Sequence, residues 1–175
     1  METVEIVAID PSLRFTGISK VSYNTETEKF KVSCCQVIKN KDSFKGTKAI
    51  SYMLEQLSEA ADDPDLLESE IVLVESPIMP FFSKFQGGAM ISVAHIAGGA
   101  ACLFGLDRVK LYRPSEWNRS KKKEVTHFDT QTILGTWETW GWKKSIKHKS
   151  QLEHVLDASS MALWYIKTNY IEKTT

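Results

Sequence analysis

The sequence predicts an α/β fold in which a mixed five-stranded sheet is flanked by helices. Five segments have the length and apolar content of strands, at residues 4–10, 17–23, 30–37, 71–75 and 108–112. The first three follow one another with short turns between them, which favours antiparallel pairing. The last two each follow a helical segment, and strands that alternate with helices pair in parallel.

The first three strands and the first helix are marked by turn residues and by periodicity. Pro11 and the polar stretch 24–28 indicate the two turns of a meander. In 46–61, apolar residues recur at three- and four-residue steps, which is the pattern of an amphipathic helix. An acidic, proline-bearing loop then leads to the strand 71–75, and Pro77 prevents that strand from continuing.

A glycine-rich helix is predicted at 84–104. Its apolar residues recur on one face, although each of its four glycines lowers helix propensity by up to about 1 kcal/mol relative to alanine. Close packing is the expected compensation for this loss. The partner of such a smooth helix is either the sheet or the same helix in a second copy of the chain, and the sequence leaves both open.

The last strand and the last helix are separated by a lysine-rich segment. The strand 108–112 ends at Arg113-Pro114. Ser150-Gln-Leu-Glu153 has the capping-box pattern, in which a serine and a glutamate satisfy the free amides at a helix start. The sequence therefore predicts a helix from this box to about Lys167.

Composition excludes several classes of protein. The chain has 175 residues, of which 42% are apolar and 25% charged, so we expect a single domain at 1–170 and a short polar tail at 171–175. The formal net charge is zero, and any contact with nucleic acid must come from a local patch. Three cysteines without metal-ligand spacing indicate reduced thiols in a cytoplasm, bacterial or that of a phage-infected host. No apolar run approaches the roughly 20 residues that span a bilayer, so we expect no membrane association.

Three acidic residues stand where a strand ends or a helix begins. Asp10 closes an aliphatic strand, Glu75 closes another, and Asp157 lies near the start of the last helix. Three such carboxylates would repel one another by about 4 kcal/mol per close pair at an effective dielectric near 20. Hard divalent cations such as Mg²⁺ prefer oxygen ligands of this kind. His154 precedes Asp157 by three residues and so shares its helical face, which adds a fourth candidate ligand.

Each of these residues also has a plainer interpretation. Asp10, followed by proline, has the pattern of a turn acid or a helix cap, and Glu75 that of a solvated strand end. His154 taken alone fits a hydrogen-bonded helix residue. The joint pattern of all four favours the metal site.

Taken in order, these motifs resemble those of the RuvC Holliday-junction resolvases of the ribonuclease H-like superfamily. The segment Ala8-Ile-Asp-Pro-Ser-Leu-Arg-Phe-Thr-Gly17 is similar to their first strand and turn, Val74-Glu-Ser76 to their second acidic strand, and His154-Val-Leu-Asp157-Ala158 to their last helix. The resemblance extends over nearly the whole chain. The chain departs from it at Ser12, where many relatives carry a glycine, and in the tryptophan-rich stretch 137–142.

The resemblance implies a ribonuclease H-like sheet and a homodimer that cuts two symmetric strands of a four-way junction or other branched DNA. It also implies that Asp10, Glu75, His154 and Asp157 are catalytic and bind metal. Hydrolysis of a phosphodiester in this way uses two ions, Mg²⁺ or Mn²⁺, about 3.5–4 Å apart. We expect Asp10 to bridge the ions, Glu75 to hold one, and His154 with Asp157 to hold the other. The alternatives are a related nuclease acting on flaps or RNA/DNA hybrids, and a non-catalytic DNA-binding recombination adaptor.

DNA contacts are predicted in two places. Between residues 119 and 149, eight basic residues stand against three acidic ones, and we predict phosphate contacts there. The predicted contacts are Arg119, Lys121, Lys122, Lys123, Lys147 and Lys149. Phe81 and Phe82 are predicted to stack on or wedge between bases, with a core role for one of them equally open, and Lys84 beside them is predicted to contact DNA as well.

The remaining aromatic and histidine residues are interpreted as structural. Trp137, Trp140 and Trp142 have no spacing that indicates a stacking platform. The other three histidines have no comparable partner nearby in the sequence, which favours surface or packing roles. They are His95, His127 and His148.

Overall fold

The computed structural model describes residues 3–77, 87–118, 121–143 and 149–172. Its sheet consists of β1 (Thr3–Asp10), β2 (Phe15–Asn24), β3 (Lys29–Lys39), β4 (Ile71–Glu75) and β5 (Val109–Tyr112). The strand order is β3-β2-β1-β4-β5, with β2 antiparallel to both β1 and β3, and with β4 parallel to both β1 and β5. This confirms the predicted mixed five-stranded sheet.

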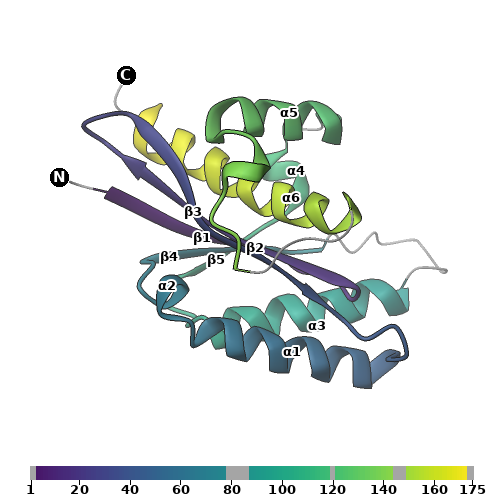
Figure 1. Ribbon diagram of the computed structural model, residues 1–175. Helices are drawn as coiled ribbons and strands as arrows, with labels where there is room; N and C mark the ends of the chain where they lie inside the picture. The colour runs from purple at the N-terminus through teal and green to yellow at the C-terminus, as the bar shows by residue number, and fades with distance from the viewer. Residues whose placement is uncertain (1–2, 78–86, 119–120, 144–148, 173–175) are drawn as a thin grey trace.

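Helices cover both faces of the sheet (Figure 1). The elements on one face are α1 (Gly46–Ala61), α2 (Pro64–Leu67) and α3 (Gly87–Leu103). Those on the other face are α4 (Pro114–Trp117), α5 (Lys123–Leu134) and α6 (Lys149–Ile166), the last continued by the π-helix η2 (Lys167–Ile171). Along the described ranges, no helix combines the length and the apolar content needed to cross a membrane.

The strand β1 divides the core into two layers. Ile6 and Ala8 belong to the apolar cluster beneath α6, whereas Val7 and Ile9 belong to the cluster beneath α1 and α3. This follows from the two-residue alternation of a strand, and it explains why β1 reads as a continuous apolar run. Both faces of β1 are therefore covered, and the strand order places β1 at the centre of the sheet.

Close approach of α6 to the sheet depends on Gly17 in β2. This glycine pairs with Asp10 across the antiparallel ladder. A Cβ atom at Gly17 would lie 2.7 Å from the backbone nitrogen of Val155 and would overlap the carbonyl group of His154. The absence of a side chain therefore lets the first turns of α6 rest on the end of β1.

The glycines of α3 have different surroundings from one another. A Cβ atom at Gly99 would overlap the side chain of Leu54, so this glycine permits close packing between α3 and α1. Around Gly88 and Gly98 a Cβ atom would meet nothing within 4 Å. Of the three glycines whose surroundings are described, Gly99 confirms the predicted compensation by close packing, and it packs against α1 instead of the sheet.

Two further predictions concern local structure. The helix α6 begins at Lys149, one residue before the Ser150 of the predicted capping box, and the side chain of Ser150 lies outside the described residues. The packing role of the tryptophans is confirmed, since Trp140 is buried and its Nε1 donates to the carbonyl of Leu134 at 3.1 Å. Trp142 pairs with Cys35, and its segment covers part of the outer edge of β3.

Candidate active site

The sheet places two acidic residues at the same edge and on the same face. The strands β1 and β4 are parallel neighbours, with Ile9 opposite Val74, so Asp10 and Glu75 both follow the paired region at its carboxyl end. Leu73, two residues before Glu75, belongs to the cluster beneath α6. Strand alternation therefore directs Asp10 and Glu75 to the face that α6 covers.

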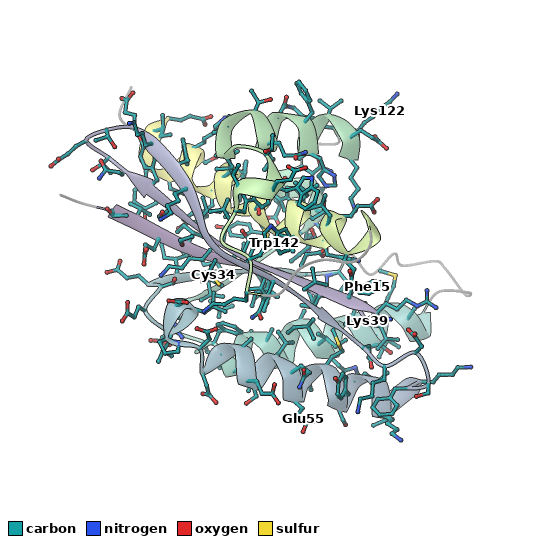
Figure 2. The ribbon with its side chains drawn as sticks, in the orientation of Figure 1. Phe15, Cys34, Lys39, Glu55, Lys122 and Trp142 are labelled. Atoms are coloured by element: carbon teal, nitrogen blue, oxygen red, sulfur yellow. The ribbon has the colours of Figure 1, made fainter. Side chains whose placement is uncertain are left out.

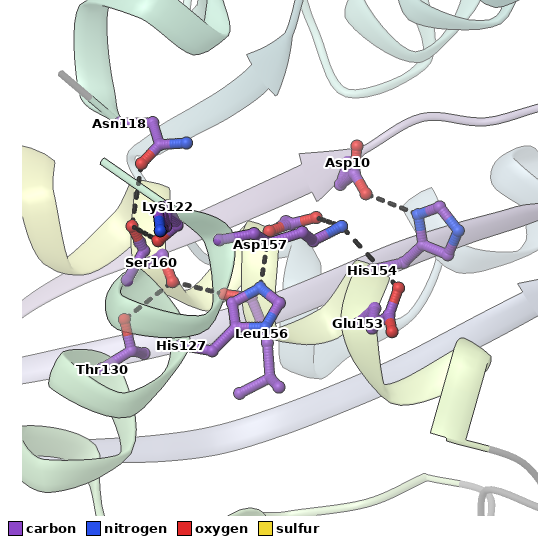
Figure 3. A network of polar contacts seen from close by, with 12 residues as sticks. Asp10, Asn118, Lys122, His127, Thr130, Glu153, His154, Leu156, Asp157 and Ser160 are labelled. Atoms are coloured by element: carbon purple, nitrogen blue, oxygen red, sulfur yellow. Dashed lines mark hydrogen bonds and ion pairs between the residues drawn. The ribbon is translucent and has the colours of Figure 1, made fainter. Parts of the chain in front are cut away.

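His154 of α6 meets Asp10 directly. Its Nδ1 lies 2.6 Å from Oδ2 of Asp10 (Figure 3). Its ring packs against Phe15 with a centroid separation of 6.0 Å. An ionised carboxylate only accepts hydrogen bonds, so toward ionised Asp10 the donor is Nδ1, and in a neutral ring this leaves the lone pair of Nε2 for another partner. A histidine held in this way by a carboxylate is oriented to bind a metal through its other nitrogen.

Asp157 lies one turn further along α6, and α5 supplies both of its partners (Figure 3). Nε2 of His127 is 2.7 Å from Oδ1 of Asp157, and Nζ of Lys123 is 2.6 Å from Oδ2. The expectation that His127 has no comparable partner is therefore wrong, because its ring contacts Asp157, which lies 30 residues away in the sequence. The surface role holds for His95, which is exposed on α3, and His148 lies outside the described residues.

Glu75 is held by Trp117, whose Nε1 donates to Oε2 of Glu75 at 3.1 Å. Burial, followed by the negative charges of Asp10 and Asp157, raises the pKa of Glu75 to about 8. The hydrogen bond from Trp117 and the charge of Lys123 oppose this rise. The acidic residues are thus close enough to repel one another.

The pKa values of Asp10 and Lys123 reflect the same surroundings. Burial raises the pKa of Asp10 above its usual range, and Asp157 adds to the rise, while His154 and Lys123 lower it. Burial lowers the pKa of Lys123, but the hydrogen bond and charge of Asp157 outweigh burial and leave the pKa raised. Lys123 is therefore a cation held within the field of the acids.

We expect Glu75→Gln to stabilise the metal-free protein at alkaline pH. The pKa of Glu75 is raised from 4.5 to about 8, so folding favours the protonated carboxyl, and this stabilisation is lost as pH rises through about 8. Glutamine stays neutral at every pH. In EDTA at pH 9 the variant should be more stable by about 1–3 kcal/mol, and the difference should shrink toward pH 4.5. Urea unfolding across this range measures it, and parallel pH profiles for both proteins would contradict the raised pKa.

The donor set suits a divalent cation, although the side chains do not surround one point. Within the described ranges, no group of three or more His, Cys, Asp or Glu residues is arranged to hold a metal ion. The oxygens of Asp10 and Asp157 instead face His154, His127 and Lys123. Carboxylates and one imidazole at a shared edge are the ligands that Mg²⁺ and Mn²⁺ accept. Burial first, and then the charges of Asp10 and Asp157, raise the pKa of Glu75, and a cation bound beside it would oppose that rise. The chemistry fits, provided that these side chains turn toward a common centre.

The predicted DNA-binding residues are only partly described. Lys122 is exposed at the start of α5 (Figure 2), while Lys121 pairs with Asp129 of the same helix at 3.2 Å. Lys123 turns inward to Asp157. Those outside the described residues are Phe81, Phe82, Lys84, Arg119, Lys147 and the side chain of Lys149.

Three residues of the site were not found from the sequence. Trp117 lies 42 positions from Glu75, and His127 lies 30 positions from Asp157, so no local spacing links either pair. Lys123 was recognised as basic but was grouped with its lysine neighbours.

The sheet order and the acids at the ends of β1 and β4 and on α6 define a ribonuclease H-like fold. Within that fold the chain is similar to RuvC of T. thermophilus in complex with a Holliday junction substrate, with a TM-score of 0.65 and 20% identity over 94% of this chain and 96% of that chain. The fowlpox virus resolvase in complex with Holliday junction DNA has a TM-score of 0.53 and 14% identity, covering 95% and 99%. The yeast mitochondrial Holliday junction resolvase Ydc2 has a TM-score of 0.51 and 12% identity, covering 98% and 86%.

These similarities confirm the predicted RuvC-like fold. No protein-family model matches the sequence, and no curated protein matches it. The likeness is therefore one of structure at low sequence identity, and it establishes the architecture that positions the site.

Proposed function

We propose that this protein is a metal-dependent DNA endonuclease that resolves four-way (Holliday) junctions during DNA recombination and repair in a cytoplasm. The observation that carries the proposal is geometric: parallel pairing of β1 and β4 brings Asp10 and Glu75 to one edge of the sheet, where α6 places His154 2.6 Å from Asp10 and Asp157 one turn further along. The substrate is supported by the shared fold, since the RuvC and fowlpox virus structures are complexes with Holliday junctions.

The proposed ligands are the four residues of this edge. Asp10, at the end of the central strand, would hold the two ions together with Glu75, His154 and Asp157. When bound, Mg²⁺ or Mn²⁺ supplies the positive charge that activates water and stabilises the departing oxygen. His154 would use Nε2, because its Nδ1 is held by Asp10. Trp117 fixes the direction of Glu75 by its hydrogen bond.

A cleavage panel tests the proposal. Four-way junctions, flaps, linear duplexes and RNA/DNA hybrids of matched sequence would be incubated with Mg²⁺ or Mn²⁺ and with EDTA. We expect symmetric cuts in the junction only, and none in EDTA. Cleavage of flaps or hybrids instead would favour a related nuclease, and junction binding without cleavage would favour a recombination adaptor.

We also propose a homodimer, because a four-way junction presents two symmetric strands. The outer face of α3 supports this: Ile91 is 47% exposed, and Gly88 and Gly98 have open space around them. A second backbone can approach such a surface closely. Light scattering should give the mass of two chains for the free protein, and that mass plus one junction for the complex. A single chain bound per junction would contradict the dimer.

Lys122→Ala should weaken junction binding by removing one phosphate contact, and so reduce the dependence of the affinity on salt concentration. Its side chain is exposed at the start of α5, so the substitution removes a surface charge and leaves the core unchanged. Each lost phosphate contact lowers the slope of log affinity against log salt by about 0.9. Fluorescence anisotropy between low and moderate salt measures this slope. An unchanged slope would assign Lys122 to solvent instead of DNA.

A further inference from the structure

Both carboxylate oxygens of Asp157 contact side chains of α5. His127 occupies Oδ1 at 2.7 Å and Lys123 occupies Oδ2 at 2.6 Å, from positions one helical turn apart (Figure 3). Asp157 is also one of the residues proposed to bind metal. A metal ion that binds Asp157 must therefore share or replace one of these two contacts.

The two partners differ in what holds them. The side chain of His127 is 12% exposed, and its ring donates from the α5 side of the carboxylate. The side chain of Lys123 is 45% exposed, and its Nζ also lies 3.9 Å from Glu153. A lysine on a flexible four-carbon stem with access to solvent can move away, whereas an enclosed imidazole has little room to do so.

The charges decide which contact gives way. The ammonium group of Lys123 and a divalent cation are both positive, and two cations on one carboxylate repel strongly at this short range. The ring of His127 offers only an N–H to Asp157 and can remain when a cation binds the other oxygen. Until then, Lys123 offsets part of the repulsion among the acids.

We infer that Lys123 is a built-in counter-cation that a divalent metal ion displaces from Asp157, and that His127 is the positioning residue that holds Asp157 in place. The inference rests on the proposed metal site and deepens it. It assigns two opposite effects to two residues of one helix. Removing Lys123 should strengthen metal binding, and removing His127 should weaken it.

Calorimetric titration with Mn²⁺ in the absence of DNA tests this inference without reference to cleavage. Lys123→Met keeps the length of the side chain and removes its charge, and it should bind Mn²⁺ about three- to tenfold more tightly than the wild type. Lys143→Met is the matched control. It removes a lysine that is ion-paired with Asp63 before β4, at the opposite end of the strand from Glu75, and its Mn²⁺ affinity should be unchanged.

The His127 variants separate positioning from general stability. His127→Leu should lower Mn²⁺ affinity about tenfold, as is typical for a lost partner of a metal ligand. His127→Gln keeps an N–H donor near the position of Nε2 and should recover most of that loss. Thermal unfolding of all variants reports whether each remains folded, and the Gln variant keeps the test decisive where the Leu variant does not fold.

The outcomes distinguish this inference from the proposed function. If the wild type binds Mn²⁺ and Lys123→Met binds it no more tightly, the displacement is contradicted while the metal site stands. Weaker Mn²⁺ binding in His127→Leu that His127→Gln largely restores, with tighter binding in Lys123→Met, supports the inference, whereas wild-type affinity in a folded His127→Leu contradicts the positioning role of His127. If neither the wild type nor Lys123→Met binds Mn²⁺, the metal site itself fails and the inference fails with it.

Discussion

Gly17→Ala is expected to destabilise the protein by about 3 kcal/mol and to abolish junction cleavage. The new Cβ atom would overlap the carbonyl group of His154, which is backbone and has no rotamer to change. The first turns of α6 must then move away from β2, and His154 and Asp157 move with them. Urea unfolding and single-turnover cleavage measure the two effects.

The control for this substitution is Gly99→Ala. Its Cβ atom would also meet a neighbour, but that neighbour is the end of the Leu54 side chain, which can rotate. A helix gains propensity from the same change, so the net cost should be less than about 1 kcal/mol, with cleavage retained. Equal losses in the two variants would mean that the approach of α6 to Gly17 does not position the site.

The sequence predicted the positions of Asp10 and Glu75 because each of these candidate residues ends a buried apolar strand. The strands β1 and β4 are apolar along their length because both faces of the sheet are covered, and each ends at an acidic residue. The change from apolar to acidic residues marks the edge of the sheet and the candidate site at once. Parallel pairing of the two strands then brings Asp10 and Glu75 together without any further information.

Prediction failed for α5, because this helix is held mainly by polar contacts. Its buried residues are Thr130 and Leu134, and Thr130 shares a hydrogen bond of 2.7 Å with Ser160 of α6. Such a helix has no clear apolar face, so the segment was described only by its lysines. His127 and Lys123 could not be assigned to the site once the helix that carries them was missed.

The lysine-rich segment also shows that a run of basic residues in the sequence need not form one basic patch on the surface. Lys121, Lys122 and Lys123 are consecutive, yet one pairs with Asp129, one is exposed, and one points at Asp157. The formation of a helix after Lys122 separates their directions. Only the middle residue keeps the simple role of a solvent-facing cation among the three.

Asp10→Asn is expected to lower the rate of junction cleavage by about 10³-fold or more while junction binding is retained. Asparagine keeps the shape of the side chain and an oxygen that can accept from His154, but it loses the charge that would hold a divalent cation. Asp10 is 6% exposed and its pKa is raised by burial, so a neutral side chain should also leave the metal-free protein at least as stable as the wild type. Gel shift in Ca²⁺ measures binding, and single-turnover kinetics in Mg²⁺ measure cleavage.

Glu153→Gln is the matched control for Asp10→Asn, since it removes the same charge one residue before His154 on α6. The side chain of Glu153 is 48% exposed and lies 3.9 Å from Lys123, at the rim of the site. Its loss should leave cleavage within about threefold of the wild type, because partly exposed ion pairs contribute little. A wild-type rate in Asp10→Asn would exclude the metal site, and equal losses in both variants would indicate that total negative charge near α6 matters more than a ligand at the end of β1. Loss in Asp10→Asn alone, with folding and binding intact, would identify the carboxylate of the central strand as the group on which hydrolysis depends.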